Sequence, residues 1–70
     1  MGAEMLVQLN GVVQALPPGA TVVDAVGRAG APERGVAVAV NGVVVPRGSW
    51  SGTPLSAGDK LEVLTAAQGG

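Results

Sequence analysis

The clearest structural pattern of the chain lies in its middle and reads Val36-Ala37-Val38-Ala39-Val40-Asn41-Gly42-Val43-Val44-Val45. Large and small apolar residues alternate over residues 36–40, which is typical of a strand with valines on one face and alanines on the other. The Asn41-Gly42 pair favours a type I′ turn, because both central residues of that turn need a positive φ. The sequence therefore predicts a β-hairpin over residues 36–45, and Pro46 ends its second strand.

A second hairpin is predicted at the N-terminal end by the same kind of signal. Residues 5–9 and 12–16 both read as short apolar strands, and Asn10-Gly11 stands between them. Pro17-Pro18-Gly19 ends the second strand, because proline cannot donate a hydrogen bond to a sheet ladder.

A short helix is predicted between the two hairpins. Thr21 is a suitable N-cap, and Asp24 three residues later completes a pattern similar to a capping box. Gly30 suits the left-handed position after a helix, and Pro32 prevents the helix from continuing. With only about two turns, this helix needs tertiary packing for its stability. Its expected apolar face consists of Val22, Ala25, Val26 and Ala29.

The C-terminal third is expected to hold a long irregular segment, Arg47 to Asp59, followed by a final strand, Lys60 to Ala66. Alternation along this strand places one set of side chains on the core face, namely Leu61, Val63 and Thr65, and the other set on the opposite face, namely Glu62, Leu64 and Ala66. The residues expected to be buried between helix and sheet are Val22, Val26, Val38, Val40, Leu61 and Val63.

The order hairpin, helix, hairpin, irregular segment, strand predicts an α+β fold with one helix across a small mixed sheet. We expect the last strand to insert between the two hairpins, parallel to the first strand. That topology is the β-grasp, or ubiquitin-like, fold. Residues 1–66 are then a single domain, and residues 67–70 form a flexible C-terminal tail that ends in Gly-Gly.

Composition excludes several classes of function. The 70 residues include no Cys and no His, so the chain has neither a thiolate nucleophile nor an imidazole base. A net charge of −1 and one aromatic residue argue against a nucleic-acid partner. The longest apolar run, residues 36–40, is far too short to span a membrane, and the start of the chain has no targeting signal, so a cytoplasmic protein is expected. The function therefore lies in being bound or acted on.

At this point the residues resemble a known family. The stretch from Arg34 to Arg47, RGVAVAVNGVVVPR, looks like the central signature of the ThiS family, the sulfur carriers of thiazole formation in thiamine biosynthesis, within the ThiS/MoaD ubiquitin-like superfamily. The resemblance covers nearly the whole chain. It continues through Leu9-Asn10-Gly11, residues 17–22, Trp50, Thr53, Leu55, Gly58-Asp59, Glu62-Val63 and the terminal Gly69-Gly70.

The resemblance implies a protein co-substrate rather than an enzyme. A partner adenylating enzyme, of the kind that starts ubiquitin activation, would use ATP to convert the Gly70 carboxylate to an acyl-adenylate. A sulfur-donor protein would then supply the sulfur of a thiocarboxylate, and thiazole synthase would receive that sulfur. The chain itself would bind no cofactor and no metal. The ATP would be used by the adenylating partner.

The chemistry of the tail agrees with this role. A chain-terminal carboxylate is ionised at neutral pH and is a poor electrophile, so acyl transfer needs prior activation. Glycines without Cβ atoms pass through a narrow channel, and residues 67–70 extend about 13 Å at about 3.3 Å per residue. In a chain this rich in glycine, however, a terminal Gly-Gly pair alone is weak evidence. It gains weight here only because it ends a β-grasp pattern.

Docking residues are expected on the sheet face opposite the core. Ala37, Ala39 and Leu64 fall on that face, and we expect them to bind the adenylating enzyme together with Ala66, Gln68 and Gly69. An ordinary solvent-exposed surface is the alternative reading of this face. For Trp50, an anchor that covers the sheet edge is favoured over a partner contact.

Other functions fit the same pattern. The small subunit of molybdopterin synthase and a carrier for tRNA thiolation would use the same fold and the same tail. A bacterial protein modifier would also end in Gly-Gly. A function of another class is a β-grasp interaction module whose tail takes part in no chemistry.

Overall fold

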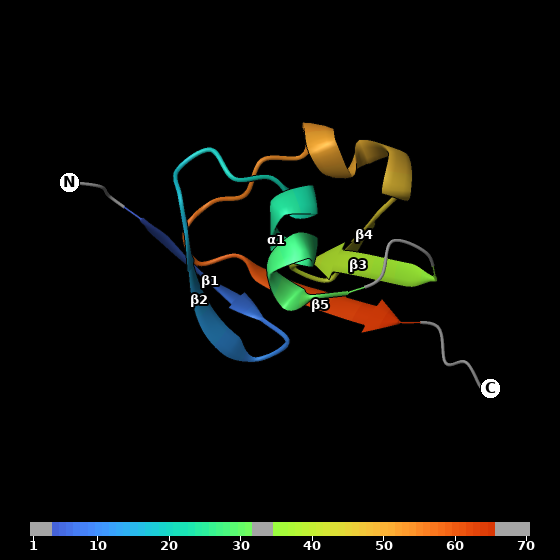
Figure 1. Cartoon of the computed structure of the whole chain (residues 1–70), viewed down its shortest axis with the longest axis horizontal. Coiled ribbons are helices and arrows are strands. Elements are labelled where there is room, and N and C mark those ends of the chain that lie inside the picture. Colours follow the sequence, from blue (N-terminus) through green and yellow to red (C-terminus); the bar gives the residue numbers. More distant parts are fainter. Residues whose placement is uncertain (1–3, 32–34, 66–70) are drawn as a thin grey trace.

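The computed structural model describes residues 4–31 and 35–65, which form one mixed five-stranded sheet, one α-helix and one 3₁₀ helix. The strand order in the sheet is β2-β1-β5-β3-β4, and the helix lies across one face (Figure 1). This is the β-grasp fold that the sequence predicts. In chain order the elements are β1 (Met5–Leu9), β2 (Val12–Leu16), α1 (Val22–Ala29), β3 (Val36–Val40), β4 (Val43–Val45), η1 (Arg47–Gly52) and β5 (Lys60–Thr65).

Both predicted hairpins are present with the predicted turns. Asn10 and Asn41 each have a φ of 52°, and Gly11 and Gly42 each have a φ of 83°. Positive φ at both central residues is what a type I′ turn requires, and it sets the register Leu9↔Val12 in one hairpin and Val40↔Val43 in the other.

Helix α1 begins and ends where the sequence signals place it. The Asp24 carboxylate accepts hydrogen bonds from the Thr21 backbone N–H at 2.8 Å and from the Thr21 hydroxyl at 3.2 Å, and left-handed Gly30 (φ 72°) follows the last turn. The helix buries Val22, Ala25 and Val26 against the sheet, whereas Ala29 at its C-terminal end is exposed and does not extend this face.

Strand β5 occupies the centre of the sheet, as predicted (Figure 1). It is parallel to β1, with Gln8 opposite Lys60 and Leu9 opposite Leu61. On its other side it is antiparallel to β3 over five residue pairs, from Val40↔Leu61 to Val36↔Thr65. The end of the described chain is therefore held on the side of β3 up to its last residue, Thr65.

The core is built mainly from small aliphatic side chains between α1 and the sheet. Five of the six residues predicted to be buried are buried, but Val40 is only half-buried, because it lies at the turn end of β3, where it packs at the margin of the core. Among the described residues no polar or charged residue is buried. The buried set is Val7, Leu9, Leu16, Ala20, Val22, Ala25, Val26, Val38, Trp50, Leu55, Leu61 and Val63.

The segment predicted to be irregular contains the 3₁₀ helix η1. Trp50 in this helix is only 3% exposed, and its indole N–H donates to the Val45 carbonyl at 2.9 Å. The Thr53 hydroxyl donates to the Ser49 carbonyl at 2.6 Å and closes the helix. The expectation of irregular structure was wrong for residues 47–52. The sequence of this segment has little intrinsic preference for a helix, and burial of the Trp50 side chain orders it. Trp50 is an anchor of the fold.

Leu61 is 1% exposed and lies at the middle of the core, so truncation to alanine leaves a cavity beneath α1. We expect Leu61→Ala to lower the free energy of unfolding by about 2–5 kcal/mol. Urea unfolding followed by circular dichroism and by Trp50 fluorescence measures this loss. Because Glu62 is exposed on the opposite face, Glu62→Ala is the matched control and should unfold near the wild-type midpoint. An unchanged midpoint for Leu61→Ala would contradict the assigned faces of β5.

Candidate functional site

The candidate site is the end of β5, from which the C-terminal segment continues. Thr65 is the last described residue, and it pairs with Val36 of β3. The predicted functional residues Ala66, Gln68, Gly69 and Gly70 lie outside the described residues. Their roles stay predictions, and the structure defines the place from which they start.

Three predicted docking residues lie on the sheet face away from α1, close to that place. Leu64 is 63% exposed, and Ala37 of β3 is its direct partner across the antiparallel ladder. Ala39, two residues further along β3, is half-buried and lies opposite Glu62. The structure thus brings Leu64 and Ala37 together as an exposed apolar pair beside the strand end, with Ala39 adjoining it.

The same face carries further exposed apolar side chains that the sequence analysis did not single out. Val44 is 69% exposed and lies opposite Ala39, and Leu6 and Val13 are exposed on β1 and β2. Hairpin register gives the signal that would have found them, because Gln8↔Val13 and Ala39↔Val44 fix which residues share this face. A polar row separates the two apolar groups; it consists of Gln8, Lys60 and Glu62.

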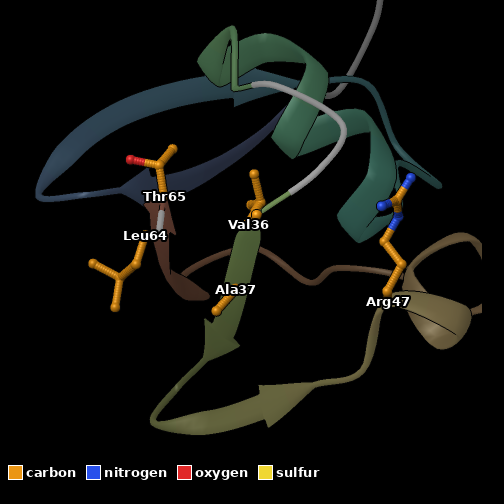
Figure 2. Close-up of a pocket in the computed structure, with 6 residues that line it drawn as sticks. Val36, Ala37, Arg47, Leu64 and Thr65 are labelled. Atoms are coloured by element: carbon orange, nitrogen blue, oxygen red, sulfur yellow. The ribbon is translucent and has the colours of Figure 1, made fainter. Parts of the chain in front are cut away.

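An open hollow of about 440 Å³ lies where β3 begins and β5 ends. Figure 2 shows Val36 and Thr65 pointing to one side of the sheet and Ala37 and Leu64 pointing to the other, so the hollow surrounds the strand ends. Its lining is mainly apolar, with one cationic side chain, and consists of Gly35, Val36, Ala37, Arg47, Leu64 and Thr65.

Arg47 contributes that positive charge from the first turn of η1. Its guanidinium carbon lies 5.1 Å from the centre of the Trp50 ring, within the range of a cation–π contact. Because Trp50 is itself buried and hydrogen-bonded to Val45, the stacked guanidinium has a firm support. The site thus combines an exposed apolar pair, a hollow and one oriented cation around the origin of the C-terminal segment.

Two kinds of feature are absent from the described residues. Over residues 4–31 and 35–65, no group of three or more His, Cys, Asp and Glu side chains is placed to hold a metal ion. No helix in this part of the chain is long and apolar enough to cross a bilayer.

Comparison with known proteins gives a family match and several matches among solved structures. The sequence matches the ThiS family over residues 7–70. The structure is similar to the crystal structure of the thiamine biosynthesis protein (ThiS) from Geobacter metallireducens, with a TM-score of 0.77 and 25% sequence identity. The similarity covers 94% of this chain and 100% of that chain. No curated protein matches the sequence.

Proposed function

The chain belongs to the ThiS family, and from this membership we propose that it is a sulfur carrier of thiamine biosynthesis that bears sulfur on the Gly70 carboxylate. The observation that carries the proposal is the extent of the family match, which runs to residue 70 and so includes Gly69-Gly70. The similarity to a thiamine biosynthesis protein over all of that protein's length supports the same pathway. In this role the chain is a co-substrate and not the catalyst.

The proposed chemistry has two steps, both catalysed by partners. In the first, a Gly70 carboxylate oxygen attacks the α-phosphorus of ATP on an adenylating enzyme, and pyrophosphate leaves. In the second, a sulfur-donor protein delivers sulfur at the oxidation level of sulfide to the acyl carbon. The carbon–oxygen bond to AMP breaks, AMP leaves with that oxygen, and a thiocarboxylate remains. Thiazole synthase is the proposed acceptor of this sulfur.

The described geometry supports this division of labour. Residues 1–66 would act as the docking domain and residues 67–70 as the reactive tail, which reaches about 13 Å when extended. Leu64 and Ala37 offer apolar contact beside the origin of the tail, and Arg47 offers a cation. A partner could therefore bind the outer face while the tail enters its active site. The residues proposed for this contact are Ala37, Ala39, Leu64, Ala66, Gln68 and Gly69.

We expect Leu64→Asp to weaken binding to the adenylating enzyme about tenfold or more, because a charge would have to be desolvated in an apolar contact. Leu64 is 63% exposed, so the variant should fold like wild type. Titration calorimetry with the enzyme measures the affinity. Val13→Asp is the matched control, since Val13 is 60% exposed on the same face but on the distant edge strand β2.

The Leu64 docking role would be contradicted by wild-type affinity in a variant with unchanged circular dichroism. An equal loss in Val13→Asp would assign the effect to net charge and not to this position.

The tail chemistry is tested by adding one alanine after Gly70. The addition moves the carboxylate by about 3.3 Å along an extended chain, and a displacement of about 1 Å can slow a positioned reaction by about a hundredfold. We expect the extended protein to melt like wild type yet to fail in ATP–pyrophosphate exchange with the adenylating enzyme. Gly70→Ala, which keeps the length and adds only a Cβ, should retain part of the activity.

Adenylation of the extended protein at the wild-type rate would overturn the carrier proposal. The interaction module without tail chemistry would then be the better reading of the fold.

A further inference from the structure

The parallel ladder between β1 and β5 ends with a side chain, and not the backbone, as the partner of β5. Its backbone rungs run from the Gln8 N–H to the Asp59 carbonyl and from the Asn10 N–H to the Leu61 carbonyl, both at 2.9 Å. At Asn10 the backbone takes a φ of 52° and turns into β2. The backbone of β1 therefore leaves β5 at Leu61, four residues before the last described residue.

The side chain of Asn10 supplies the next rung. Its Oδ1 accepts a hydrogen bond from the Val63 N–H at 2.8 Å, and its Nδ2 donates to the Val63 carbonyl at 3.1 Å. A side-chain amide has one acceptor and two donor hydrogens, so it pairs with a strand residue as a peptide group would. Because Val63 is only 7% exposed, these two backbone groups have little access to water.

A second asparagine side chain, that of Asn41, binds the backbone at the other end of β5. Asn41 accepts a hydrogen bond from the Lys60 N–H on its Oδ1 at 3.0 Å, and its Nδ2 donates to the Asp59 carboxylate at 3.0 Å. Its own backbone N–H donates to the Lys60 carbonyl at 2.7 Å. The two Asn-Gly turns thus hold opposite ends of one strand, Asn41 the entry and Asn10 the exit.

We propose that Asn10 is a positioning residue that fixes the direction in which the C-terminal segment leaves the sheet. Without its amide, the last residues of β5 are held on one side only, by the pairing of Val63, Leu64 and Thr65 with β3. A strand end that is hydrogen-bonded on one side only can rotate about that ladder. A small rotation there displaces residues further along the chain by a larger distance. The inference rests on the proposed function, in which this segment must reach a partner's active site.

Glycine substitution separates this role from a role in the turn. Glycine takes a positive φ without cost and forms type I′ turns, so Asn10→Gly keeps the hairpin and removes only the amide. Asn41→Gly is the control, because it removes an asparagine amide from the same type of turn at the far end of β5, where the hydrogen bonds of that amide are exposed. A purely structural role predicts a loss of stability without a selective loss of kcat in adenylation.

The test has two readouts on the full chain. Amide hydrogen exchange should accelerate at Val63 in Asn10→Gly and at Lys60 in Asn41→Gly, because these are the N–H groups that donate to the two asparagine side chains. In steady-state adenylation, Asn10→Gly should lower kcat about tenfold or more, with a KM within about twofold of wild type, because docking is kept and the carboxylate is misplaced. Asn41→Gly should leave both constants within about twofold of wild type.

The proposal is overturned if Asn10→Gly keeps the wild-type kcat, or if both variants lose kcat equally. If Asn10→Gly does not fold, Asn10→Asp replaces it, since aspartate keeps the turn and the acceptor for the Val63 N–H but removes the donor; its kcat should fall less steeply, and a wild-type kcat would again overturn the proposal. A wild-type chain that is not adenylated would contradict the proposed function instead. Exchange at the Val63 N–H then decides alone whether Asn10 holds the strand end.

Discussion

The C-terminal strand lies in the middle of the sheet, and the rest of the structure is arranged around that placement. Strand β5 has hydrogen-bonded neighbours on both sides, and its inward side chains Leu61 and Val63 are buried beneath α1. Strands β4 and β5 are both antiparallel to β3, which lies between them, so they run parallel to each other and no short turn can connect them. The chain therefore passes through η1 and a long loop before it enters β5. The C-terminal segment consequently follows the central strand of the sheet.

Strand β5 also places two properties that a carrier needs, a stable fold and a surface for a partner, on its two opposite faces. Its inward face contributes to stability, and its outward face leaves Leu64 exposed beside Ala37, where we propose that a partner binds. Because strand side chains alternate, a surface substitution on β5 leaves the core intact, and the two properties can change independently. Since the core is composed largely of valine, leucine and alanine, the indole of Trp50 supplies its one large ring and also supports Arg47 at the hollow.

Local sequence signals account for most of the fold. The alternation over residues 36–40, the two Asn-Gly pairs and the Thr21–Asp24 cap act within a few residues, and each element that they predict is present. The features that the sequence analysis did not predict depend on contacts between residues far apart in the chain. The 3₁₀ turn around Trp50 depends on a buried ring, and the Asn10 amide pairs with Val63, 53 residues away. Sequence analysis identified Asn10 only as a turn residue, because its second role appears only when β5 lies beside β1. The exposed pair Leu64 and Ala37 could be placed on the outer face from alternation alone, whereas placing Val44 there needed the register of its hairpin.

Sulfur transfer to the chain end is the central claim, and the intact mass of the wild-type chain tests it most directly. The chain is incubated with the adenylating enzyme from the same cell, ATP and a sulfide-level sulfur donor, and a reaction without ATP is the control. We expect the mass to change by the replacement of one oxygen with one sulfur, only when ATP is present, and fragmentation should locate the sulfur at Gly70. An unchanged mass with an active enzyme, or sulfur located at any other residue, would contradict the claim.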